Sequence, residues 1–196
     1  MGDIKSATEI AMEKAKNIGE ATEEERLKWK YVPEGEKLAA RYLKEECNLV
    51  AELNKYEQNV TKYVAEGAAE ILIRNISLPN GDLARRNNKR AMDGLKIVKS
   101  DKVAVENVYS KIRRIFDHYI GQGAQQRKQA YETLKSEFEA KMRQAVQQQL
   151  GSFIGFKIDV ERQPQFQEEW RRVESQLNSQ YLKLLDEYKQ ELLAIA

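Results

Sequence analysis

Apolar residues recur every three or four positions through most of the chain. The repeat is clearest in residues 42–71 and again in residues 166–195. Each residue advances about 100° around an α-helix, so this spacing places the apolar side chains along one side of a helix. Stretches of this length predict extended helices that bury that side against other helices.

The same pattern gives approximate bounds for the helices. Three long helices are expected at residues 34–75, 101–150 and 165–195, and a short helix is expected at residues 82–99. Residues 79–81 (Pro-Asn-Gly) predict a turn, since proline ends a helix and Asn-Gly accepts a positive φ. Gly121 and Gly123 predict a kink, because glycine is less favourable than alanine in a helix by about 1 kcal/mol. Pro164 suits the first turn of the last helix.

Residues 1–33 are expected to form an N-terminal helical arm. Residues 3–18 have the spacing of a modest first helix. Thr22 followed by Glu25 is the pattern of a capping box, which predicts a second short helix. Pro33 is expected to interrupt the chain before the first long helix begins.

These elements predict an all-α fold. Three long amphipathic helices joined by short turns should pack antiparallel, as an elongated and coiled-coil-like bundle. The expected organisation is an arm at residues 1–33 and a bundle at residues 34–196, with the short basic helix between the first two long helices. Long apolar seams also favour self-association, so a homodimer is expected.

Composition excludes several classes of protein. Of the 196 residues, 33% are charged and 41% are apolar, and only 3 are proline. This balance is typical of long-helix proteins and argues against a disordered chain or a β-sandwich. No apolar stretch is long enough to span a membrane, and the first residues lack the apolar core of a signal peptide. A cytoplasmic location is therefore expected.

Residues suited to catalysis or metal binding are scarce. The chain has one cysteine, Cys47, and one histidine, His118. Neither a nucleophile–base pair, a metal-ligand cluster nor a glycine-rich phosphate loop is recognisable, so no cofactor, metal or enzymatic activity is expected. We interpret Cys47 as a small buried apolar residue, with a reactive thiol as the alternative. We interpret His118 as an ordinary helix residue.

Positive charge is concentrated between residues 84 and 114. This stretch has a net charge of +7, whereas the whole chain carries +2. The candidate side chains for binding an anion or a nucleic acid are Arg85, Arg86, Lys89, Arg90, Lys96 and Lys99. Clustered cations attract phosphate backbones through counterion release. The alternative is a solvated basic face that is balanced by acidic residues of another helix or subunit.

Trp29 and Tyr31 lie in the arm, outside the long apolar stretches. We expect them to fasten the arm to the bundle. If they are exposed, they become candidate anchors for a partner, since tryptophan and tyrosine often dominate the energy of an interface.

A non-enzymatic interaction protein fits these observations best. Long helices supply binding surfaces, so a scaffold, an adaptor or an assembly factor is expected. The alternative is a nucleic-acid- or ribosome-associated helical protein that uses the basic stretch at residues 85–114.

Overall fold

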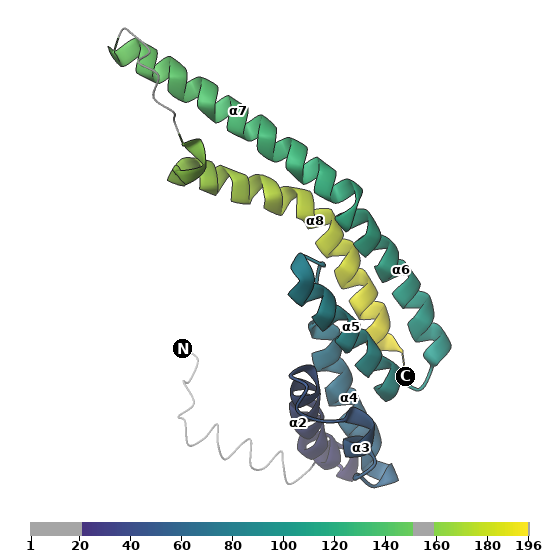
Figure 1. Cartoon of the computed structure of the whole chain (residues 1–196). Helices are drawn as coiled ribbons and strands as arrows, with labels where there is room; N and C mark the ends of the chain where they lie inside the picture. Colours follow the sequence, from purple (N-terminus) through teal and green to yellow (C-terminus); the bar gives the residue numbers. More distant parts are fainter. Residues whose placement is uncertain (1–20, 151–158, 196) are drawn as a thin grey trace, which may run out of the picture. The chain divides into compact units, whose positions relative to one another are not determined.

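The computed structural model describes residues 21–150 and 159–195, and all secondary structure within these ranges is helical (Figure 1). The predicted all-α class is confirmed. The helices are α2 (Glu23–Leu43), α3 (Leu49–Leu53), α4 (Gln58–Arg74), α5 (Gly81–Val98), α6 (Lys102–Ile120), α7 (Gln122–Leu150), the 3₁₀ helix η1 (Val160–Arg162) and α8 (Pro164–Ala194). The helix expected at residues 3–18 lies outside the described residues.

The chain divides into two compact units. The first contains the described residues up to Ile76 together with Lys89–Lys102, and the second contains Ser77–Asn88 and Val103–Ile195. Helix α5 therefore begins in the second unit and ends in the first. A single antiparallel bundle of three long helices stays a prediction.

The long helix expected at residues 34–75 is wrong, because α2, α3 and α4 occupy this part of the chain. Helix α2 ends at Leu43, and Glu45 follows with a φ of 66°, which is incompatible with a continuing right-handed helix. Asn48 then caps α3 by accepting a hydrogen bond from the backbone N–H of Ala51 at 3.1 Å. The chain thereby returns, and α4 packs against α2.

Pro33 does not interrupt the chain, and it lies inside α2. Proline removes one helical hydrogen bond and leaves the carbonyl of Trp29, four residues earlier, without its donor. Pro33 and Trp29 are both exposed, so water can satisfy that carbonyl. The boundary expected between residues 33 and 34 therefore falls within a continuous helix.

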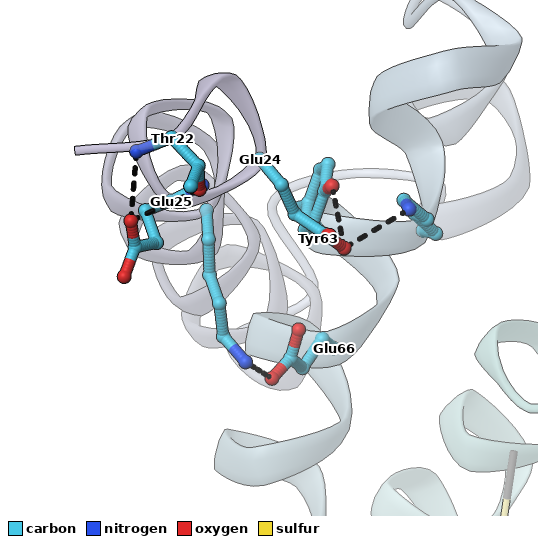
Figure 2. A network of polar contacts seen from close by, with 7 residues as sticks. Thr22, Glu24, Glu25, Tyr63 and Glu66 are labelled. Atoms are coloured by element: carbon cyan, nitrogen blue, oxygen red, sulfur yellow. Dashed lines mark hydrogen bonds and ion pairs between the residues drawn. The ribbon is translucent and has the colours of Figure 1, made fainter.

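The predicted capping box at the start of α2 is confirmed. The Thr22 hydroxyl accepts from the N–H of Glu25 at 3.2 Å, and the Glu25 carboxylate accepts from the N–H of Thr22 at 2.8 Å. Figure 2 shows this cap beside the polar contacts that join α2 to α4. There Glu24 accepts a hydrogen bond from the Tyr63 hydroxyl at 3.2 Å, and Glu66 pairs with an α2 lysine at 2.5 Å.

Two glycines bring α2 and α4 into very close contact. A Cβ built on Gly35 would lie 2.0 Å from the carbonyl oxygen of Val64, and one built on Gly67 would lie 2.0 Å from that of Val32. Gly35 thus lies against the carbonyl of Val64, three residues before Gly67. Gly67 lies against the carbonyl of Val32, three residues before Gly35. Around this crossing the core of the first unit is formed by Leu38, Ala39, Leu49, Val60, Val64, Ala68 and Leu72.

The second unit is built on an antiparallel helical hairpin. Helices α6 and α7 follow one another and α8 returns beside them, with aromatic contacts along the seam. The ring of Tyr119 meets Tyr181 edge-on at 5.3 Å between centroids, and Tyr131 meets Trp170 edge-on at 5.0 Å. Their pairing in reverse order fixes the antiparallel direction.

Three local predictions in the second unit are confirmed. The kink predicted within residues 101–150 is present, since α6 ends at Ile120, α7 begins at Gln122 and the chain changes direction between the two helices (Figure 1). Pro164 lies in the first turn of α8. Gly81 at the start of α5 has a φ of 85°, the positive value that the Pro-Asn-Gly turn requires.

Candidate interaction surfaces

A groove runs between α6 and α8 in the second unit. Its volume is about 640 Å³. The α6–α8 groove is lined by Lys111, Arg114, Ile115, His118, Gln126, Gln176, Leu177, Gln180, Tyr181, Leu184 and Tyr188. Leu184 is 41% exposed. The groove therefore offers apolar and aromatic surface to solvent.

The charged residues of this groove have one sign. Lys111 and Arg114 lie along α6, and the lining contains no carboxylate. Lys111 pairs with Glu191 at 2.7 Å and lies over the ring of Tyr188, 5.4 Å from its centroid. Arg114 has no ion-pair partner within residues 21–150 and 159–195. The α6 side of the groove is thus suited to a ligand with negative charge.

A hydrogen bond joins His118 and Tyr181, which both line the groove. The Nδ1 atom of His118 lies 2.8 Å from the Tyr181 hydroxyl, and the Tyr181 ring packs edge-on against Tyr119. His118 on α6 and Tyr181 on α8 are thus joined by a hydrogen bond.

The predicted basic side chains of α5 have different environments. Arg85, Arg86, Lys89 and Lys96 are exposed. Arg90 is half-buried: its Nε donates to the carbonyl of Tyr42 at 2.5 Å, its guanidinium lies 4.4 Å from the Tyr42 ring centroid, and it pairs with Glu45 at 3.4 Å. Arg90 thus joins α5 to the end of α2.

The last residue of the predicted basic set, Lys99, is half-buried, and this burial lowers the pKa of its ammonium group. The spacing of residues 82–99 also predicts Leu83 and Asn87 on the inner side of α5, and this prediction is wrong. Leu83 and Asn87 are exposed, and Asn88 is buried in their place. The Asn88 amide accepts from the N–H of Ser77 at 2.8 Å and donates to its carbonyl at 2.7 Å. These two hydrogen bonds hold the turn that precedes α5.

Trp29 and Tyr31 face different surroundings on α2. The Tyr31 ring packs edge-on against Tyr56 with 6.2 Å between centroids, so it belongs to the first unit. Trp29 is 54% exposed. Of the two predicted anchors, Trp29 is the one whose surface is open to a partner.

Cys47 is half-buried after α2, and its Sγ lies 3.9 Å from the carbonyl oxygen of Leu38. In the part of the chain that the structure describes, no group of three histidine, cysteine or acidic residues is placed to hold a metal ion. Within the same residues, no helix combines the length and apolarity that crossing a membrane requires.

Sequence reasoning missed the α6–α8 groove although its residues were in the apolar repeat. Leu177, Tyr181, Leu184 and Tyr188 all follow the three- and four-residue spacing and were expected to be inner positions. The neighbouring helices cover only part of this stripe, and the uncovered part lines the groove. The signal that could have indicated the groove is the width of the apolar stripe on α8, compared with the number of helices that can cover it.

The described residues define a protein of the all-α class. Residues 50–194 match a family described as "Family of unknown function (DUF6657)", and the chain belongs to this family. The match includes α4 to α8, and with them the α6–α8 groove. No curated protein and no solved structure matches the chain.

Proposed function

We propose that this protein acts by binding another protein through its helical surfaces, as a scaffold, adaptor or assembly factor without catalytic activity. The observation that carries this proposal is the α6–α8 groove, where Leu184 and two tyrosines are presented beside cationic side chains. Two adjacent antiparallel helices form the groove into which a third helix packs in helical bundles. A helix laid in such a groove is a common mode of recognition.

The charges of the groove specify the chemistry of the occupant. Lys111 and Arg114 lie on one side, and the α8 side presents the neutral amides of Gln176 and Gln180. An amphipathic helix with an apolar stripe bordered on one side by glutamate or aspartate would complement both sides. The partner we propose is therefore an acidic amphipathic helix.

We also propose that the protein forms a homodimer. Exposed leucines on α8 support this, since Leu182 is 53% exposed and Leu193 is 41% exposed. They are eleven residues apart, three helical turns, and so lie on the same side of α8. Size-exclusion chromatography with light scattering tests the dimer, and a monomeric mass at high protein concentration would contradict it.

Site-specific photo-crosslinking tests the groove. A photoreactive phenylalanine analogue replaces Leu184 in the native host, and crosslinked proteins are identified by mass spectrometry. We expect one dominant adduct with an acidic helical segment, and we expect Arg114→Glu to reduce it at least tenfold. Arg172→Glu, an exposed charge reversal on α8 outside the groove lining, is the matched control and should leave the adduct unchanged. Equal crosslinking in both variants would refute the proposal.

A second candidate function is supported by exposed cations on α5. Arg85, Arg86 and Lys89 are all exposed on this helix. Exposed cations contact nucleic-acid phosphates, and such binding weakens steeply as salt rises. If nucleic acid copurifies with the protein and is lost when all three residues are changed to alanine, this candidate gains support. Unchanged copurification would exclude it.

A further inference from the structure

One side of α2 carries a straight row of cations. The basic face of α2 consists of Arg26, Lys30, Lys37 and Arg41 together with the C-cap residue Lys44, and all five residues are exposed. At about 100° per residue their positions fall within about 60° of one another around the helix. From the first to the last they span about 27 Å at 1.5 Å per residue. The opposite side of α2 is buried through Gly35, Leu38 and Ala39.

Four of these cations are not neutralised by ion pairs. Among the described residues, Lys30, Lys37, Arg41 and Lys44 have no carboxylate within ion-pair distance. Other lysines of the same unit are paired, such as Lys28 with Glu66 at 2.5 Å. The basic face of α2 therefore keeps its positive charge available to a ligand outside the first unit.

An exposed aromatic ring accompanies the basic face. Trp29 is 54% exposed and lies one turn or less from Arg26 and Lys30. Tryptophan is enriched where apolar and polar media meet, because its ring is largely apolar and its N–H needs a polar partner. The basic face thus combines a row of charge with one side chain suited to an interface.

The arrangement of charge around α2 favours a flat ligand. A helix inserted into a groove of duplex nucleic acid has phosphates on both of its flanks, but Glu34 and Glu36 flank the basic face of α2. A partner helix would place Lys30 and Lys37 at the centre of the contact, where the desolvation of ammonium groups is costly. A planar anionic surface meets the row of cations first and leaves their heads hydrated.

We propose that the basic face of α2 binds the surface of an anionic lipid membrane. In this arrangement α2 lies parallel to the lipid headgroups, Lys37, Arg41 and Lys44 face their phosphates and carboxylates, and the Trp29 ring enters the interfacial layer. The contact is peripheral, because the apolar side of α2 remains buried against α4.

Vesicle cosedimentation of the full chain tests this surface. The vesicles contain phosphatidylcholine alone or with about one third phosphatidylserine. Each surface cation contributes about fivefold to binding, so the variant Lys37→Gln/Arg41→Gln/Lys44→Gln should bind phosphatidylserine vesicles about a hundredfold more weakly. Glutamine is a good helix former, so the variant keeps α2.

The matched control removes the same number and kind of charges elsewhere. Lys128→Gln/Arg172→Gln/Lys183→Gln changes three exposed residues of the second unit and should bind vesicles like the wild type. A second readout follows Trp29 alone in a Trp170→Phe background, since the chain has 2 tryptophans. Its emission should shift to shorter wavelength with phosphatidylserine vesicles and not with phosphatidylcholine vesicles.

Three results would overturn the proposal. The first is equal binding to the two kinds of vesicle. The second is an equal loss of binding in the test and control variants, which would indicate a general effect of net charge. The third is a duplex DNA, RNA or acidic protein ligand that binds at physiological salt and depends on the basic face of α2 while the vesicles do not bind.

Discussion

Adding one methyl group at the crossing of α2 and α4 should destabilise the first unit. The usual effect of Gly→Ala inside a helix is stabilising, by about 1 kcal/mol. At Gly35 the new Cβ would lie 2.0 Å from the carbonyl oxygen of Val64 and 2.9 Å from the backbone nitrogen of Ala68. Both atoms belong to the backbone of α4, so no change of side-chain rotamer relieves the contact.

The size of the destabilisation by Gly35→Ala follows from the distance by which the backbones of α2 and α4 must move apart. Ordinary contacts of a Cβ begin at 3.4 Å, so a distance of 2.0 Å requires the backbones to move apart by about 1.4 Å. A gap of about 1 Å already removes up to half of the dispersion energy between facing atoms. Overpacking costs about 1–3 kcal/mol and occasionally more. After the gain in helix propensity we expect Gly35→Ala to lower the free energy of unfolding by about 2 kcal/mol.

Urea unfolding measures this change. In the Trp170→Phe background, fluorescence reports Trp29 in the first unit, and far-UV circular dichroism reports the whole chain. A loss of about 2 kcal/mol lowers the midpoint by about 1 M urea at a typical m-value. Gly67→Ala should lower the urea midpoint by a similar amount, because its Cβ would lie 2.0 Å from the carbonyl oxygen of Val32.

Two comparisons make the test specific to the crossing. Gly121→Ala is the control, because Gly121 is exposed and its Cβ would have one neighbour, the carbonyl oxygen of Asp117 at 3.2 Å. This substitution should leave the midpoint unchanged or raise it. The double variant of Gly35 and Gly67 should lose less than the sum of the single losses, since one separation accommodates both methyl groups. A wild-type or higher midpoint for Gly35→Ala would refute the reasoning.

Three further predictions concern hydrogen bonds at particular sites. Asn88→Ala should lower the free energy of unfolding by about 2 kcal/mol in a urea titration, because both hydrogen bonds to Ser77 are lost. Thr22→Ala should cost about 1 kcal/mol by thermal denaturation, through loss of the cap of α2. Hydrogen bonds also hold the pKa values of Glu25 and Glu161 below their usual value of 4.5. Their contribution to stability is therefore complete above pH 4.5 and is lost as the pH falls through their lowered pKa values, which unfolding curves recorded in acid should show.

The parts of the fold that could be predicted depend on short-range chemistry. The cap at Thr22, the positive φ of Gly81 and the start of α8 at Pro164 are decided by residues within one turn of one another. A short stretch of sequence therefore contains all the residues on which each of these features depends. The helix bounds that rest on these signals were accordingly correct within a few residues.

The break between α2 and α4 could not be predicted from the apolar repeat. Leu49, Leu53 and Val60 keep the spacing of one long helix, yet α3 and α4 are separate helices. All three side chains are buried, because both helices turn their apolar sides inward. The spacing of apolar residues reports which side chains are buried, and it does not report whether the backbone between them is continuous.

Because Pro33 was expected to interrupt the chain, the basic face of α2 could not be predicted either. It assigned Lys30 to an arm and Lys37 to a different helix, so their common side could not be recognised. The net charge of residues 1–57 is −3, so the charge of this stretch does not indicate the exposed cations of α2. The sign of a surface is set by the side of the helix on which charges lie, and this requires the bounds of the helix to be known.

The two surfaces we propose have different relations to the family. The α6–α8 groove lies wholly within the matched residues 50–194, whereas the basic face of α2 lies before them. The groove is therefore the surface to test in other members, with Arg114 and Leu184 as the positions to compare. Because the two surfaces share no residue, Arg114→Glu should leave vesicle binding intact, and loss of the α2 cations should leave crosslinking from Leu184 intact. Loss of both activities in either variant would show that the two surfaces do not act independently.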